Sequence, residues 1–143
     1  GKTKNRPVAF ASGFGLRSGA LATSTAPDDN NIVCVGTNPD DMAVAINTII
    51  ENNGGQAVVD GGKVKAFLPL PIGGIVSDIE PEEMAAKEYE LDEAARALGC
   101  SLPWPFMYMF VLQITAIPDF AMTDLGAIDC VKLEVVDPLK MAL

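Results

Sequence analysis

The sequence contains no histidine, and this absence excludes several kinds of chemistry at once. Serine–histidine–aspartate and cysteine–histidine nucleophile systems both need an imidazole base, and the usual catalytic zinc sites need imidazole ligands. We therefore expect no catalytic residue, no transition-metal site and no bound cofactor within these 143 residues.

Basic residues are also scarce. Ten Lys and Arg stand against 19 Asp and Glu, which gives a formal net charge of -9 and a pI near 4.3. Because such a surface repels phosphate backbones and anionic lipid headgroups, neither nucleic acid nor a membrane surface is an expected partner. The longest apolar stretch, residues 103–112, is roughly half of the ~20 residues that a membrane-crossing helix needs.

Cysteine is limited to Cys34, Cys100 and Cys130. An odd number in apolar surroundings does not make a disulfide framework, so we expect reduced thiols and a cytoplasmic protein. No signal-peptide pattern is visible. The basic segment 1–6 begins with Gly rather than Met, and we expect it to be a frayed leader on a piece cut from a longer protein.

What is present suffices for a packed core. With 49% hydrophobic and 20% charged residues, the chain predicts a single domain over residues 1–143. The expected strands cover residues 7–11, 20–25, 31–36 and 132–137, with a hairpin over residues 56–68 that turns at Gly61 and Gly62. Continuous apolar character places the strand at 31–36 in the middle of a sheet, covered on both faces.

Two helices carry clear start and stop signals. The first begins at the N-cap Asn38, has Pro39 at its first helical position and ends at Gly54. The second runs from Pro81 to Leu98 and stops at Gly99. Because strands and helices mix without a strict βαβ repeat, the sequence predicts an α+β fold, a two-layer α/β sandwich with a mixed sheet and two main helices.

The glycine-rich segment 13–19 resembles a dinucleotide-binding loop, but its spacing is G-x-G-x-x-x-G and a strand follows it. The cofactor loop requires a helix whose N-terminus can hold the pyrophosphate. A flexible turn is therefore the better interpretation.

Carboxylates are the remaining candidates for a metal site. Asp28 and Asp29 could bind a hard cation, and Asp119, Asp124 and Asp129 could form a cluster. However, Asp and Asn dominate turns for conformational reasons, so we favour solvated turn carboxylates over a metal site.

Four aromatic residues gather in one short segment: Trp104, Phe106, Tyr108 and Phe110. Its two prolines argue against a regular buried strand. The segment is either core, since a domain of this size needs aromatic residues inside, or an exposed apolar interface that a partner covers. The sequence leaves both interpretations open.

Several segments together resemble the C-terminal domain of adenine deaminase, of the metal-dependent amidohydrolase superfamily. These are "GFGLRSGALATSTAPDDNNIVCVGTNPDDMAVAIN", "NGGQAVVDGGKVKAFLPLPIGGIVSD", "LPWPFMYMF" and "TDLGAIDC". The resemblance implies a divergent, non-catalytic domain that packs on a preceding TIM barrel. That barrel would bind Mn, Fe or Zn and hydrolyse adenine to hypoxanthine and ammonia. We expect the chain alone to be inactive and the whole protein to be a homo-oligomer.

The resemblance also marks a loop. In the family pattern this segment reads Ala-His-Asp-Ser-His-Asn, which places histidines where this chain has Pro27 and Asn30 and keeps Asp28 and Asn31. The interpretation is a divergent contact loop near the active site, formed by Pro27, Asp28, Asp29, Asn30 and Asn31. An alternative function remains: an autonomous small-ligand-binding or assembly module without an enzymatic role.

Overall fold

The computed structural model describes residues 6–26 and 31–138. Along the chain the elements are β1 (Ala20–Thr23), β2 (Val33–Gly36), α1 (Pro39–Glu51), β3 (Gly55–Asp60), β4 (Lys63–Pro69), α2 (Pro81–Ala97), α3 (Pro105–Val111), β5 (Phe120–Thr123), β6 (Gly126–Asp129) and β7 (Glu134–Val136). The first four strands form one sheet in the order β2-β1-β3-β4, and the last three form a second sheet in the order β5-β6-β7.

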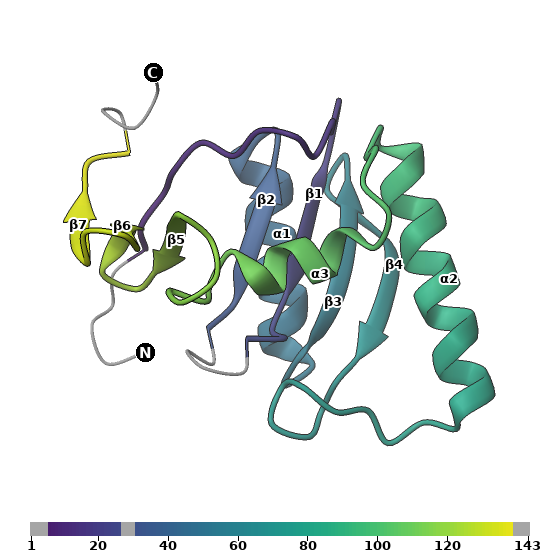
Figure 1. The fold of residues 1–143 in the computed structure, drawn as a ribbon. Coiled ribbons are helices and arrows are strands. Elements are labelled where there is room, and N and C mark those ends of the chain that lie inside the picture. Colours follow the sequence, from purple (N-terminus) through teal and green to yellow (C-terminus); the bar gives the residue numbers. More distant parts are fainter. Residues whose placement is uncertain (1–5, 27–30, 139–143) are drawn as a thin grey trace.

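Helices cover both faces of the four-stranded sheet (Figure 1). Successive side chains of a strand point to opposite faces, and β1 shows this directly. Ala20 and Ala22 belong to the core on the α1 side, whereas Leu21 between them belongs to the core on the side of α2 and α3. The result is a helix–sheet–helix arrangement.

The two cores differ in the size of their residues. On the α1 side, four of the six buried residues are alanines, which lets the helix approach the sheet closely; the six are Ala20, Ala22, Ala45, Ile49, Ala57 and Val59. The other core contains larger side chains, among them Phe14, Leu21, Val58, Leu68, Leu91, Phe106 and Met109. Most of the buried apolar volume therefore lies between the sheet and the α2–α3 layer.

The start of α1 is fixed to the β3–β4 turn by a buried carboxylate. Asn38 caps the helix as predicted, accepting the backbone N–H of Asp41 at 2.8 Å. The Asp41 side chain in turn accepts hydrogen bonds from Asn38 Nδ2 at 2.8 Å, from the Gly62 N–H at 2.6 Å and from the Gly61 N–H at 3.3 Å. The Asn38 bond and these backbone donors lower the pKa of Asp41 below its ordinary value.

The turn itself confirms the hairpin prediction. Gly61 and Gly62 have φ values of 60° and 72°, the left-handed region that a two-residue hairpin turn of type I′ requires at both positions. Because these glycines also present their N–H groups to Asp41, the turn connects the sheet to the helix.

The aromatic segment forms the helix α3 rather than a strand. Pro105 occupies the first position of the helix, where a missing backbone N–H costs nothing. Trp104 precedes it with a φ of 50°, a left-handed conformation that is rare for a bulky residue. Phe106 and Met109 are buried against the four-stranded sheet, so one side of this helix is core.

The three-stranded sheet lies at the end of the molecule away from α2 (Figure 1). None of its residues belongs to either core cluster. Its buried residues within strands are Ala121, Ala127 and Asp129. A backbone hydrogen bond from the Met122 N–H to the Leu112 carbonyl, 2.8 Å long, joins β5 to the end of α3.

The predicted α+β sandwich is confirmed, with both main helices in place, and three details differ. Every strand pair in the described part of the chain is antiparallel, so the sheet is not mixed. The helices lie on both faces of the sheet rather than in one layer. The short helix α3 and the hairpin of β5 and β6 were not expected.

One strand prediction was wrong. Residues 7–11 form no strand, and Val8 and Phe10 are exposed, because alternating apolar residues alone provide no strand partner. The strand predicted at 31–36 is β2, and its side chains pack toward both cores as expected, but it lies at the edge of the sheet rather than in the middle, and its residues are only half-buried. The predicted leader, residues 1–6, lies outside the described residues except for Arg6. Among the described helices none is both long and apolar enough to cross a membrane.

Candidate functional site

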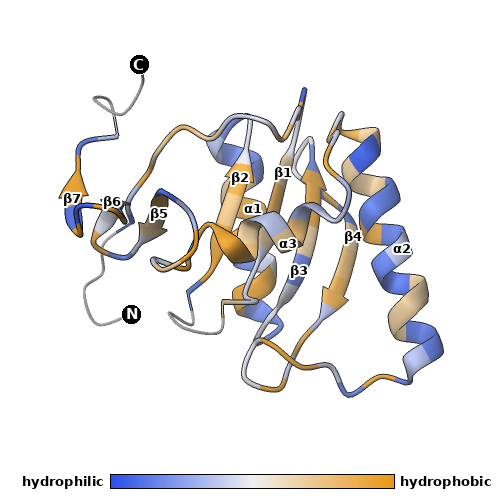
Figure 2. Ribbon diagram, in the orientation of Figure 1, coloured by the Kyte–Doolittle hydropathy of each residue, from blue (hydrophilic) through white to orange (hydrophobic). Residues whose placement is uncertain are grey.

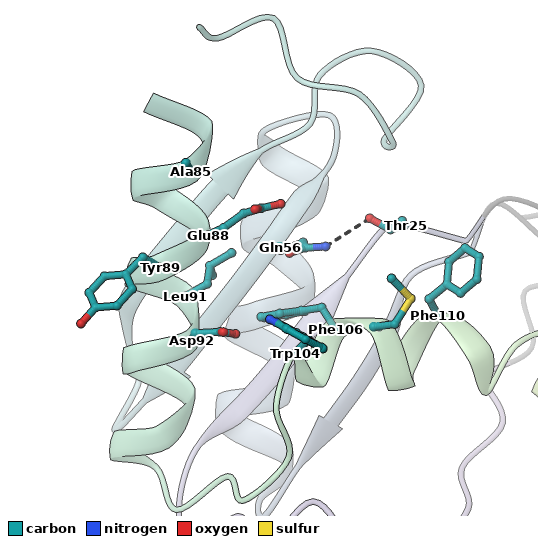
Figure 3. Close-up of a pocket in the computed structure, with 11 residues that line it drawn as sticks. Thr25, Gln56, Ala85, Glu88, Tyr89, Leu91, Asp92, Trp104, Phe106 and Phe110 are labelled. Atoms are coloured by element: carbon teal, nitrogen blue, oxygen red, sulfur yellow. Dashed lines mark hydrogen bonds between the residues drawn. The ribbon is translucent and has the colours of Figure 1, made fainter. Parts of the chain in front are cut away.

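A groove of about 480 Å³ lies between α2 and α3, over the end of β3 (Figure 3). It is open to solvent on one side. Its lining residues are Thr25, Gln56, Ala85, Glu88, Tyr89, Leu91, Asp92, Trp104, Phe106, Met107 and Phe110. The groove exists because α2 and α3 pack on the same face of the sheet but do not pack closely against each other. This leaves a space between the two helices.

The aromatic wall of the groove comes from α3 and the residue before it. Phe106 is buried in the core, whereas Trp104 is 71% exposed. Phe110 is half-buried and also lines the groove. Tyr108 is half-exposed and is not part of the lining. The structure thus brings three of the four predicted interface residues to one groove, and it makes Phe106 a core residue as well.

The polar groups of the groove can bind but do not form a catalytic set. Gln56 Nε2 lies 3.4 Å from Thr25 Oγ1, and the carboxylates of Glu88 and Asp92 come from α2 (Figure 3). No lining residue in the described part of the chain is basic, and none is a cysteine. Such a surface accepts hydrogen bonds and positive charge.

The contact loop begins beside this groove. Pro27, Asp28, Asp29 and Asn30 lie outside the described residues, and Asn31 is half-buried. The segment before them is held firmly: Ser24 Oγ donates to the Gly74 carbonyl at 2.6 Å and accepts the Gly55 N–H at 2.8 Å. Thr25, in the described segment that precedes the loop, lines the groove.

The described residues do not provide a metal site. They contain no group of three or more Cys, Asp or Glu side chains that could hold an ion, so Asp119, Asp124 and Asp129, the less favoured alternative of the sequence analysis, do not form a cluster. Asp129 instead forms an ion pair with Lys132 Nζ at 3.0 Å and accepts the Lys132 N–H at 2.9 Å. The backbone and side-chain bonds from Lys132 lower the pKa of Asp129.

The cysteines do not supply a reactive thiolate at the groove either. Burial raises the pKa of the Cys34 thiol to about 12, so it stays protonated at neutral pH. Its Sγ lies 3.9 Å from the Met42 carbonyl, inside the contact between β2 and α1. This cysteine is a packing residue.

Sequence reasoning missed the polar part of the groove: Thr25, Gln56, Glu88 and Asp92. They come from three separate segments of the chain and follow no motif. Only the packing of α2 and α3 on one sheet face brings them together, and one sequence contains no signal for this.

Comparison with known proteins assigns the family. A family model described as the adenine deaminase C-terminal domain matches residues 1–134. "Adenine deaminase 4" of Rhizobium meliloti (strain 1021) is 73% identical over 97% of this chain, but the match covers 23% of that relative. "Adenine deaminase 1" of Desulfotalea psychrophila (strain LSv54 / DSM 12343) is 54% identical over the same shares of both chains.

A more distant relative, the adenine deaminase of Clostridium botulinum (strain ATCC 19397 / Type A), is 42% identical over 89% of this chain and 21% of its own length. The chain therefore spans less than a quarter of the curated relatives it matches. On the strength of the family match and these identities, the chain belongs to the adenine deaminase C-terminal domain family.

Proposed function

We propose that this chain is the non-catalytic C-terminal domain of an adenine deaminase or a close relative of one, and that it packs on a metal-dependent TIM-barrel domain. The parent reaction is the hydrolytic deamination of adenine to hypoxanthine and ammonia. The observation that carries the proposal is the match of almost the whole chain to less than a quarter of a 73% identical relative. The unmatched part of that relative provides room for a catalytic domain.

The chemistry of the chain agrees with a supporting role. The sequence has no imidazole, the described residues provide no carboxylate cluster, and no cysteine among them lines the groove. Hydrolytic deamination needs an activated water, which in metal-dependent hydrolases comes from a bound metal. The divalent metal, Mn, Fe or Zn, belongs to the barrel in this proposal, because the residues here do not fit it.

The groove is the surface proposed to face the barrel. Trp104 is exposed beside it, and the loop of residues 27–31 begins at its edge. Pro27 and Asn30 replace the two imidazoles of the family pattern, so this loop would contribute contacts and shape rather than proton transfer or metal binding. The whole protein is proposed to be a cytoplasmic homo-oligomer.

The test compares the full-length protein with this chain alone. We expect the full-length protein to release ammonia from adenine, and the isolated chain to release none because it lacks a water-activating centre. Metal analysis of both proteins after dialysis should find the metal only in the full-length protein. One tightly held Zn, Mn or Fe per isolated chain would contradict the proposal.

The groove also favours a second function, an autonomous ligand-binding or assembly module. A concave surface with aromatic walls and a few polar groups is the usual form of a small-ligand site. This function predicts that the isolated chain binds a small molecule or a partner with the same affinity as the full-length protein. If the groove were accessible only in the isolated chain, this second function would be excluded.

A further inference from the structure

The three-stranded sheet and the turn that follows β6 expose large apolar side chains. Leu133 is 80% exposed and Val131 is 76% exposed. The other exposed apolar residues of this part are Ile117, Phe120, Leu125 and Val135. We call this set the β5–β7 patch. Figure 2 shows the hydrophobic character of β7 at the end of the molecule.

This sheet has no core of its own. Its cross-strand register places Ala121, Ile128 and Val135 on one face, and of these only Ala121 is fully buried. On the other face the buried residues are Ala127 and Asp129, which bury little apolar area. Short strands need a hydrophobic face packed against another element to be stable. Among the described residues, no helix and no strand of the other sheet packs extensively against β5–β7.

Leu133 adds an independent observation. Its φ of 58° is left-handed, a conformation that is unfavourable for a bulky residue. The turn between β6 and β7 thus combines an unfavourable backbone conformation with an apolar side chain in solvent. Such outliers persist where the surrounding structure fixes them.

The relatives indicate which partner covers the patch. The match leaves about three quarters of each relative outside this chain, and the family is a C-terminal domain, so the additional polypeptide precedes it. The first described segment, residues 6–12, starts at the end of the molecule where β5–β7 lie (Figure 1). Val8 and Phe10 on this segment are themselves exposed. A preceding domain would thus be connected directly beside the patch.

A second copy of the chain is a weaker candidate. Two chains that each carry a net charge of -9 repel one another, whereas a tethered domain is present at high effective concentration. The continuity of the patch with the entering segment therefore favours the tethered domain.

We propose that the β5–β7 patch is a docking surface for the domain that precedes this one in the same polypeptide, with Leu133 as its central anchor. This rests on the proposed function, in which that domain is the catalytic barrel. The contact lies beyond the groove and the aromatic segment, at the other end of α3. It makes the three-stranded sheet a second contact between the two domains, in addition to the groove.

The experiment measures the reactivity of single cysteines in the native full-length protein. Leu133→Cys and Val131→Cys test the patch, and Ile50→Cys and Ile72→Cys are controls, since both isoleucines are exposed in this domain away from the three-stranded sheet. We expect a maleimide reagent to modify the two patch cysteines at least about 10-fold more slowly than the controls. All four should react equally in denaturant.

Equal native rates for patch and control cysteines in a protein that deaminates adenine would overturn the docking surface while leaving the proposed function intact. Slow patch cysteines that become fast on dilution would identify a second copy as the occupant and would also overturn it. Slow, concentration-independent patch cysteines in a full-length protein that does not deaminate adenine would support the docking surface and reject the proposed function instead. Peptide mass spectrometry separates these sites from Cys34, Cys100 and Cys130.

Discussion

The four-stranded and the three-stranded sheets of this domain are built from similar strands but differ in what covers them. The first has α1 on one face and α2 with α3 on the other, and large side chains such as Leu21 and Leu68 are fully buried. The second buries alanines and one carboxylate and leaves Leu133 in solvent. Strand pairing alone therefore does not create a core: the four-stranded sheet has one on each face, and the three-stranded sheet has none among the described residues.

The largest expected effect separates the two sheets by stability. Leu21→Ala in the isolated chain should lower the free energy of unfolding by about 3 kcal/mol, because it leaves a cavity in the main core. Leu133→Ala should change the same quantity by less than about 0.5 kcal/mol, since this side chain is exposed. Urea denaturation followed by far-UV circular dichroism measures both.

The parent chain is expected to unfold cooperatively in this experiment. A melt without a cooperative transition would show that the domain does not fold alone. If Leu133→Ala were as destabilising as Leu21→Ala, the two sheets would share a core and the contrast between them would be incorrect.

A smaller effect comes from two buried carboxylates, Asp41 at the start of α1 and Asp129 at the end of β6. The pKa values of Asp41 and Asp129 are both lowered in the folded chain, so each contributes stability above its ordinary pKa of 3.8. That contribution is lost as the pH falls through the lowered pKa. Asp41 joins α1 to the main sheet, whereas Asp129 acts within the turn after β6.

We therefore expect Asp41→Asn to reduce the urea midpoint at pH 7 and to weaken its decline between about pH 5 and pH 3. Asp129→Asn should leave the midpoint nearly unchanged and should instead speed amide hydrogen exchange in β6 and β7. A common effect of both variants on global stability would show that the small sheet unfolds together with the main one.

The smallest effect on stability is expected at the groove. Trp104→Ser should change the free energy of unfolding by less than about 0.5 kcal/mol, because the ring is largely exposed. In the full-length protein the same change should weaken the contact between domains, measured as faster proteolysis between them. Phe106→Ser is the matched control: it should destabilise by about 3 kcal/mol as a core substitution. A large loss of stability from Trp104→Ser would make that ring part of the core.

Local signals in the sequence predicted the parts of the fold that depend on neighbouring residues. Asn38 and Pro39 set the start of α1, and Gly61 and Gly62 set the hairpin turn, because capping and positive φ values are properties of a few adjacent positions. Pro105 was an equally good helix-start signal for α3, but it lay inside a segment interpreted only for its aromatic residues.

The features that could not be predicted are non-local. The apolar strand β2 was expected at the centre of the sheet. In the structure the strand order is β2-β1-β3-β4, so β1 lies between β2 and β3, and β2 is at the edge. Asp41 lies in the first turn of α1 beside its cap Asn38, yet it also accepts hydrogen bonds from the glycines of a turn 20 residues away. The groove residues share no motif and meet through packing alone, so a single sequence does not identify them.

The pairing of Thr23 with Val33 has a consequence for how this family can diverge. Residues 24–32 connect two adjacent antiparallel strands, and Ser24 is fixed at the start by its bonds to Gly55 and Gly74. Because the strand register is set outside the loop, exchanging the side chains within it leaves the sheet unchanged. We therefore expect a change of side chain at positions 27 and 30 to leave the pairing of β1 with β2 unchanged.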